Sequence, residues 1–70
     1  MALDATKLGQ NIKRLRQAKE LSQDDLARQA DLKFSNLAKL EGGFNINPTL
    51  ATLVSLAGIL TGGSIDKLLK

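Results

Sequence analysis

The sequence predicts an all-α fold, a compact bundle of five short helices in one domain spanning residues 1–70. Apolar residues recur at helical spacing, strand-like alternation persists nowhere, and glycine pairs or polar capping residues separate the apolar runs. A chain of 70 residues buries only a thin core, so the helices must pack closely.

The first helix is expected near Thr6–Ala18, where apolar residues recur at helical spacing among polar ones. These residues are Leu8, Ile12 and Leu15. A second helix is expected after Ser22, which can cap it, because Asp25 occupies the position of the acid in a capping box. The buried stripe of this helix consists of Leu26, Ala27 and Ala30.

The second helix is expected to stop at Asp31-Leu32, and a third helix follows at once. Its apolar residues are Phe34, Leu37 and Leu40. We expect Leu37 and Leu40 to face inward and Leu32 to fill the turn. Gly42-Gly43 end this helix, since glycine commonly follows a helix C-terminus.

Asn47-Pro48 is expected to start the fourth helix, with asparagine as the cap and proline in the first helical position. The apolar face of this helix is expected to consist of Leu50, Leu53, Val54, Ala57 and Leu60. Gly62-Gly63 stop it, and Ser64 caps a fifth helix. The apolar residues of that last helix are Ile65, Leu68 and Leu69.

Composition excludes several classes of site. The chain has no cysteine and no histidine, so disulfides, the usual zinc sites and cysteine- or histidine-based catalysis are excluded. The neighbouring carboxylates of Asp24-Asp25 point in different directions on a helix, so we expect no enzyme, cofactor or small-molecule substrate. The run Leu50–Leu60 is too short and too polar to span a bilayer, and the N-terminus does not resemble a signal peptide. A cytoplasmic protein is therefore expected.

The segment Gln23–Gly42 carries the functional interpretation, because it forms two short helices joined by a tight turn. The exposed positions of its second helix are expected to be Lys33, Phe34, Ser35, Asn36, Ala38 and Lys39. A helix presented in this way fits the major groove of DNA, and its N-terminal residues reach base edges. The formal net charge of +3 suits a polyanionic partner.

The chain from Leu8 to Leu69 resembles the Cro/CI-type helix-turn-helix domain of phage repressors and many bacterial regulators. The matching stretches are Ile12-Lys13-Arg14-Leu15-Arg16, Leu21-Ser22-Gln23-Asp24-Asp25-Leu26-Ala27, Leu37-Ala38-Lys39-Leu40-Glu41-Gly42-Gly43, Asn47-Pro48-Thr49-Leu50 and Ser64-Ile65-Asp66-Lys67-Leu68-Leu69. The resemblance implies a lambda-repressor-like fold and a sequence-specific transcriptional regulator of the repressor type. Its expected partner is double-stranded DNA.

The resemblance also implies roles for single residues. Gln23 is expected to contact a base or a phosphate and to brace the recognition helix. The other recognition positions are Lys33, Phe34, Ser35 and Lys39, and the positions that commonly contact phosphate are Ser22 and Asn36. Arg16 and Glu41 match an ion pair between the first helix and the end of the third.

Three positions depart from the family pattern. Asp31 replaces the usual turn glycine and must tolerate a left-handed backbone. Lys33 replaces the usual Ser or Thr cap of the recognition helix, which leaves Asp31 as a candidate acceptor for that helix terminus. Phe34 replaces a polar base-reading residue and suits either a thymine methyl group or a protein contact.

No charged residue lies between Glu41 and Asp66. This stretch is either a small neutral surface or a subunit interface, because charged residues are depleted at interface centres. In the second interpretation the chain is a homodimer on a two-fold operator, with Ile59 as the central apolar contact. The interface residues would be Phe44, Ala51, Ser55 and Ile59. The alternative function is a protein-interaction module, such as an antitoxin-like partner, in which Phe34 and the fourth helix contact protein.

Overall fold

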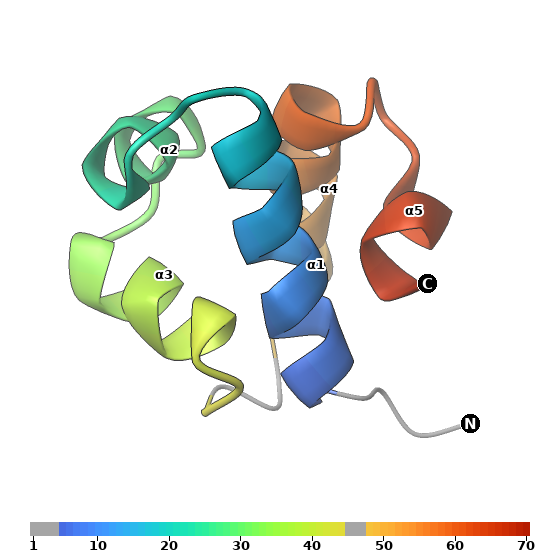
Figure 1. The fold of residues 1–70 in the computed structure, drawn as a ribbon, viewed down its shortest axis with the longest axis horizontal. Coiled ribbons are helices and arrows are strands. Elements are labelled where there is room, and N and C mark those ends of the chain that lie inside the picture. The colour runs from blue at the N-terminus through green and yellow to red at the C-terminus, as the bar shows by residue number, and fades with distance from the viewer. Residues whose placement is uncertain (1–4, 45–47) are drawn as a thin grey trace.

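The computed structural model describes residues 5–44 and 48–70, and that part of the chain contains five helices and no strand. The helices are α1 (Ala5–Ala18), α2 (Gln23–Gln29), α3 (Phe34–Glu41), α4 (Leu50–Leu60) and α5 (Ile65–Leu69). In Figure 1, α1 runs through the middle of the bundle, with α2 and α3 on one side, α5 on the other and α4 behind. The predicted all-α fold of five short helices is confirmed.

The core forms around α1, which contacts α3, α4 and α5. Every helix contributes a large aliphatic side chain that is almost completely buried, and burying each one stabilises the fold by about 1.5–3 kcal/mol. These residues are Leu8, Ile12, Leu26, Leu37, Leu40, Leu56 and Leu68. The expected inward direction of Leu37 and Leu40 is confirmed, and Leu32 packs against the core from the turn.

Side-chain caps begin α2 and α5 as the sequence predicts. Ser22 Oγ accepts a hydrogen bond from the Asp25 backbone N–H at 3.0 Å, and the Asp25 carboxylate accepts one from the Ser22 N–H at 3.3 Å. Hydrogen bonds from Ser22, followed by those from Arg28, hold the pKa of the Asp25 carboxyl below its usual value. Ser64 caps α5 by accepting from the Lys67 N–H.

The C-terminal ends of α1, α2 and α3 share one backbone motif. Glu20, Asp31 and Gly43 each follow a helix with a positive φ, of 57°, 56° and 78° respectively. The next N–H reaches back five residues in each case, from Leu21 to Arg16, from Leu32 to Ala27 and from Phe44 to Lys39, which is the Schellman arrangement. The left-handed backbone expected at Asp31 is therefore present. Leu21 and Leu32 pack against the core, whereas Phe44 is exposed.

The start of α4 differs from the prediction. Pro48 precedes the helix instead of occupying its first position, while Asn47 lies outside the described residues. Thr49 is the cap, because its Oγ1 accepts a hydrogen bond from the Thr52 N–H at 3.1 Å. A hydroxyl cap satisfies the same helix-terminal donor that we expected asparagine to satisfy.

The buried face of α4 also differs from the predicted one. Leu50 and Val54, which were expected to face inward, are 68% and 52% exposed. Leu56 is completely buried in their place, and Ile59 packs partly buried against the core. Apolar residues lie at nearly every angle around α4 and no charge marks its outer side, so periodicity alone cannot determine which face is buried.

Candidate nucleic-acid interface

The pair α2 and α3 presents one face of α3 to solvent. Leu26, Ala27 and Ala30 bury the inner side of α2, and Leu37 and Leu40 bury the inner side of α3. Because Asp31 adopts a left-handed conformation and Leu32 packs beneath the turn, α3 leaves α2 in a new direction. The opposite face of α3 is therefore free for a partner.

The outer face of α3 is polar and cationic apart from one aromatic ring. Lys33, Phe34, Ser35, Asn36 and Lys39 are all exposed, and Ala38 is half-buried. Ser35 and Lys39 are four residues apart, so they share the centre of this face. The only carboxylate within α3 is that of Glu41, which is buried. The exposed surface of α3 thus suits an anion.

The N-terminus of α3 has no side-chain cap at Lys33. Asp31, which we expected as a substitute acceptor, forms no hydrogen bond to this terminus within the described residues, so that expectation is wrong. The backbone of Asp31 ends α2, and its carboxylate instead lines a pocket beside α4.

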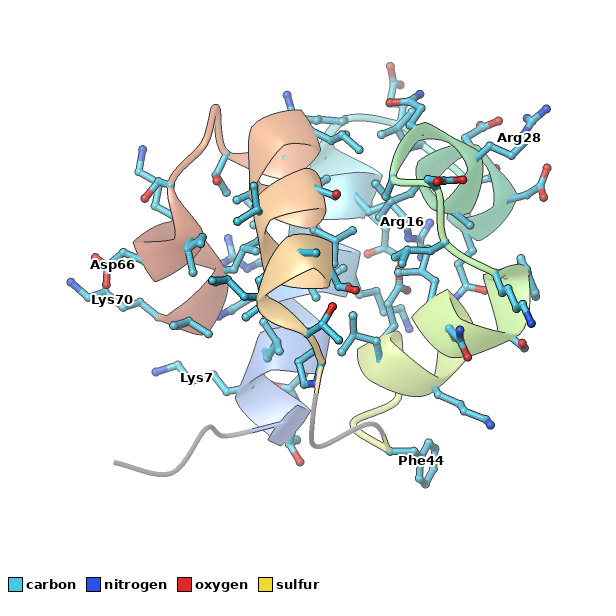
Figure 2. The ribbon with its side chains drawn as sticks, turned by 180° about the vertical axis from the view of Figure 1, so that it is seen from behind. Lys7, Arg16, Arg28, Phe44, Asp66 and Lys70 are labelled. Atoms are coloured by element: carbon cyan, nitrogen blue, oxygen red, sulfur yellow. The ribbon has the colours of Figure 1, made fainter. Side chains whose placement is uncertain are left out.

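A buried network joins the end of α3 to α1 and α2. The Arg16 guanidinium donates to both Glu41 carboxylate oxygens, from Nε at 2.7 Å and from Nη2 at 3.0 Å. The two side chains are 10% and 3% exposed, and Arg16 also donates to the Leu21 backbone oxygen at 2.8 Å. In Figure 2 Arg16 lies inside the bundle, while Arg28 projects outward from α2. The ion pair expected for Arg16 and Glu41 is thus present in bidentate form.

Gln23 belongs to the same network. Its Nε2 donates to Glu41 Oε1 at 3.1 Å, so the first residue of α2 is tied to the last residue of α3. Sequence reasoning placed Gln23 near the recognition helix but did not identify Glu41 as its partner. The bond holds the half-buried Gln23 side chain at the C-terminal end of α3.

Two further residues hold α3 and α5 against α1, and sequence reasoning did not identify either of them. Gly9 is buried, and a Cβ at this position would overlap the Leu40 backbone oxygen and lie 2.8 Å from that of Glu41. Asn11 is buried and donates from Nδ2 to the Leu68 backbone oxygen at 2.8 Å. The available signal was their place next to Leu8 and Ile12, on the buried side of an amphipathic helix.

Residues 12–68 match a family model described as helix-turn-helix. The chain belongs to the helix-turn-helix family. The resemblance to Cro/CI-type domains is thereby confirmed, and α2 and α3 form the motif that gives the family its name.

Related proteins and solved structures agree with this assignment. The immunity repressor protein of Bacillus phage phi105 is 43% identical over 53 residues, which cover 76% of this chain but 36% of that protein. The restriction-modification controller protein C.AhdI from Aeromonas hydrophila is 35% identical with a TM-score of 0.84, covering 93% of this chain and 96% of its own. SinR, the master regulator for biofilm formation, solved in complex with DNA, is 32% identical with a TM-score of 0.83, and the coverages are 90% and 98%.

A second surface of interest in this helix-turn-helix domain is the outer face of α4, which was expected to form a subunit interface. Ala51 and Ser55 are exposed as expected, and Phe44 is 82% exposed, projecting from the loop after α3 (Figure 2). Ile59, which was expected to be exposed at the centre of an interface, instead packs partly buried against the core. Leu50 and Val54 are the large apolar side chains exposed on α4.

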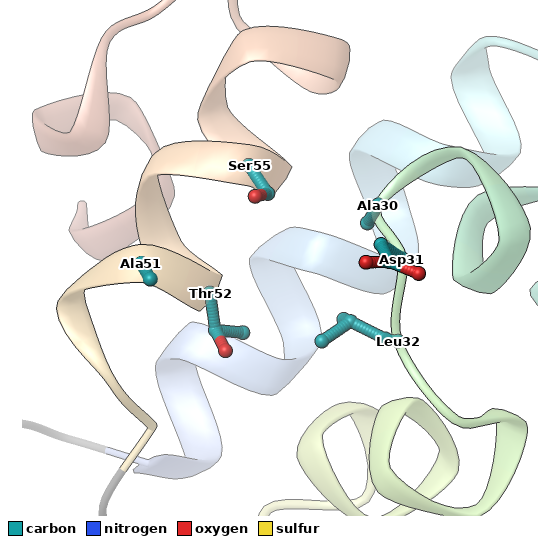
Figure 3. Close-up of a pocket in the computed structure, with 6 residues that line it drawn as sticks. All are labelled: Ala30, Asp31, Leu32, Ala51, Thr52 and Ser55. Atoms are coloured by element: carbon teal, nitrogen blue, oxygen red, sulfur yellow. The ribbon is translucent and has the colours of Figure 1, made fainter.

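A pocket of about 190 Å³ lies between the α2–α3 turn and α4 (Figure 3). Its lining residues are Ala30, Asp31, Leu32, Ala51, Thr52 and Ser55. This volume is below the roughly 300–1,000 Å³ of typical small-molecule sites. The described residues also contain no group of three potential metal-ligating side chains, and no helix among them is long and apolar enough to cross a membrane.

Proposed function

We propose that this helix-turn-helix domain is a sequence-specific DNA-binding transcriptional regulator of the repressor type, with α3 in the major groove of double-stranded DNA. The observation that carries the proposal is the outer face of α3, where Lys33 and Lys39 are exposed without an exposed carboxylate on the same helix. A repressor among the relatives, and a DNA complex among the similar structures, support the same partner. We propose no catalytic activity and no cofactor for this domain. We expect the protein to act in the cytoplasm, where its DNA lies.

The proposed docking uses the two helices differently. Residues at the centre of the α3 face, Ser35 and Lys39, point toward base edges, and Asn36 and Ser22 flank them at positions suited to phosphate contacts. Gln23 stands at the start of α2, held by Glu41, where its amide reaches the DNA beside α3. The lysines release counterions from the phosphates, so affinity falls steeply as salt rises.

The variants Lys39→Ala and Gln23→Ala are expected to weaken binding to a DNA site selected from a random pool. Loss of a base contact costs about 1–3 kcal/mol, which corresponds to roughly 5- to 150-fold in Kd. Fluorescence anisotropy across a salt series measures both the affinity and its salt dependence, while circular dichroism checks that each variant is folded.

The matched control is Lys67→Ala, which removes the same charge from α5 on the far side of α1 from α3 (Figure 1). This variant is expected to bind nearly as well as the parent at moderate salt. Equal losses for Lys39→Ala and Lys67→Ala would show that only net charge matters, which contradicts the proposed orientation of α3.

We further propose that two copies pair through the outer face of α4 on a two-fold DNA site. The corrected interface centres on Leu50 and Val54, with the small exposed side chains of Ala51 and Ser55 allowing close approach. Exposed apolar side chains in an uncharged stretch fit an interface centre. Phe44, on the loop after α3, remains part of the proposed interface.

Val54→Lys is expected to prevent pairing, because it would place a charge at the apolar centre of the interface. The monomer should keep its fold, since Val54 is half exposed. Sedimentation equilibrium of the parent and variant measures the change, and Gln17→Lys on the exposed side of α1 is the control for added charge. A parent that remains monomeric both at high concentration and on its DNA site would contradict the pairing.

A further inference from the structure

The two aromatic side chains of this protein are both on its surface. Phe34 is 52% exposed and Phe44 is 82% exposed, and the chain has no tryptophan or tyrosine. The described core is built from aliphatic side chains alone. A phenyl ring stabilises a fold strongly when it is buried, so an exposed ring on this small protein has apolar surface left for a partner to cover.

Phe34 is the first residue of α3. The proposed function places this N-terminal end of the helix against base edges. Lys33 and Ser35 precede and follow it, and both are exposed. Along the helix, Phe34 stands four residues before Ala38, so the two form a short apolar strip beside Ser35 and Lys39.

The charge around Phe34 favours a nucleic acid over a protein as the partner. The exposed residues of α3 around the ring are cationic or neutral and polar, and no further large apolar side chain of α3 is exposed. A protein-binding centre is expected to group several apolar anchors, as Leu50 and Val54 do on α4. A single ring next to Lys33, on a helix that also exposes Lys39, instead complements an anionic surface that offers an isolated apolar group.

We infer that Phe34 is a specificity-determining residue that packs against the 5-methyl group of a thymine in the major groove. This inference rests on the proposed function and names one base that the protein reads. The phenyl ring carries no hydrogen-bond donor or acceptor, so it cannot pair with the polar edges of adenine, guanine or cytosine. The thymine methyl is the apolar group that the major groove presents, and placing the ring against the other bases would remove water from their polar atoms without replacing it.

The test replaces each thymine of the selected DNA site, one at a time, by deoxyuridine, which lacks only the methyl group. At one position in each half-site the parent protein is expected to bind about fourfold more weakly, the effect of losing one buried methyl group. Phe34→Ala is expected to bind thymine and deoxyuridine DNA equally at that position. Its melting temperature should stay close to that of the parent, because the ring is half exposed.

Lys67→Ala is the control, since it alters an exposed residue of α5 on the far side of α1 from α3 and should retain the full dependence on the methyl group. A selected site without thymine under α3, or the same thymine dependence in the parent and in Phe34→Ala, would overturn the inference while leaving DNA binding established. A parent that binds no DNA in the selection would overturn the proposed function together with the inference. If Phe34→Ala proves unfolded, Phe34→Gln is measured instead, and it too is expected to lose the dependence on the methyl group.

Discussion

Glu41→Ala is expected to lower the free energy of unfolding by about 3–5 kcal/mol, because it removes one partner of a buried ion pair. Glu41 accepts three hydrogen bonds, two from Arg16 and one from Gln23. Its loss would leave the buried Arg16 guanidinium without a counter-charge. A domain of this size is stable by roughly 4–10 kcal/mol in total, so much of that stability would disappear. Urea denaturation followed by circular dichroism measures the change.

The double variant Arg16→Met, Glu41→Leu shows whether Glu41 stabilises the fold by compensating the charge of Arg16 or by packing. Replacing both partners of a buried pair by apolar side chains of similar volume is often neutral or stabilising. The double variant should therefore be markedly more stable than Glu41→Ala alone. If both are equally unstable, the role of Glu41 is packing rather than compensation of the Arg16 charge.

Gly9→Ala is the second substitution with a large expected effect. The new Cβ would overlap the Leu40 backbone oxygen and crowd that of Glu41, and backbone atoms cannot move aside as a flexible side chain does. Helices α1 and α3 must therefore separate, and we expect a loss of about 3 kcal/mol or more. In a chain of this length each kcal/mol lowers the melting temperature by about 4–8 °C, so calorimetry or thermal circular dichroism detects the effect easily.

Gly58→Ala provides the same chemical change with the opposite expected sign. Gly58 lies within α4, is exposed, and has no atom within 4 Å of the Cβ position. Alanine is favoured over glycine in a helix interior by about 1 kcal/mol, so this variant should melt at a higher temperature than the parent in dilute solution. A stability for Gly9→Ala similar to that of Gly58→Ala would show that α1 and α3 are not in close contact at Gly9.

Local chemistry made much of the fold predictable from the sequence. Ser22 and Ser64 start helices because a hydroxyl satisfies an amide at the helix terminus, and Gly43 and Asp31 end helices by adopting a positive φ. Where a helix has distinct polar and apolar sides, its orientation was also predictable. The inner face of α3, with Leu37 and Leu40, and the exposure of Lys33–Asn36 and Lys39 follow from this contrast.

The remaining features depend on contacts between residues far apart in the chain, which only the tertiary structure decides. The hydrogen bond from Gln23 to Glu41, the close approach at Gly9 and the bond from Asn11 to Leu68 depend on how the helices meet. The orientation of α4 is the clearest case. Its sequence is apolar at nearly every angle, so burying Leu56 and exposing Leu50 and Val54 is determined by the surfaces of the helices packed against it. The sequence by itself therefore determined five helices and the solvent-facing side of α3, while packing decided which side of α4 remained exposed.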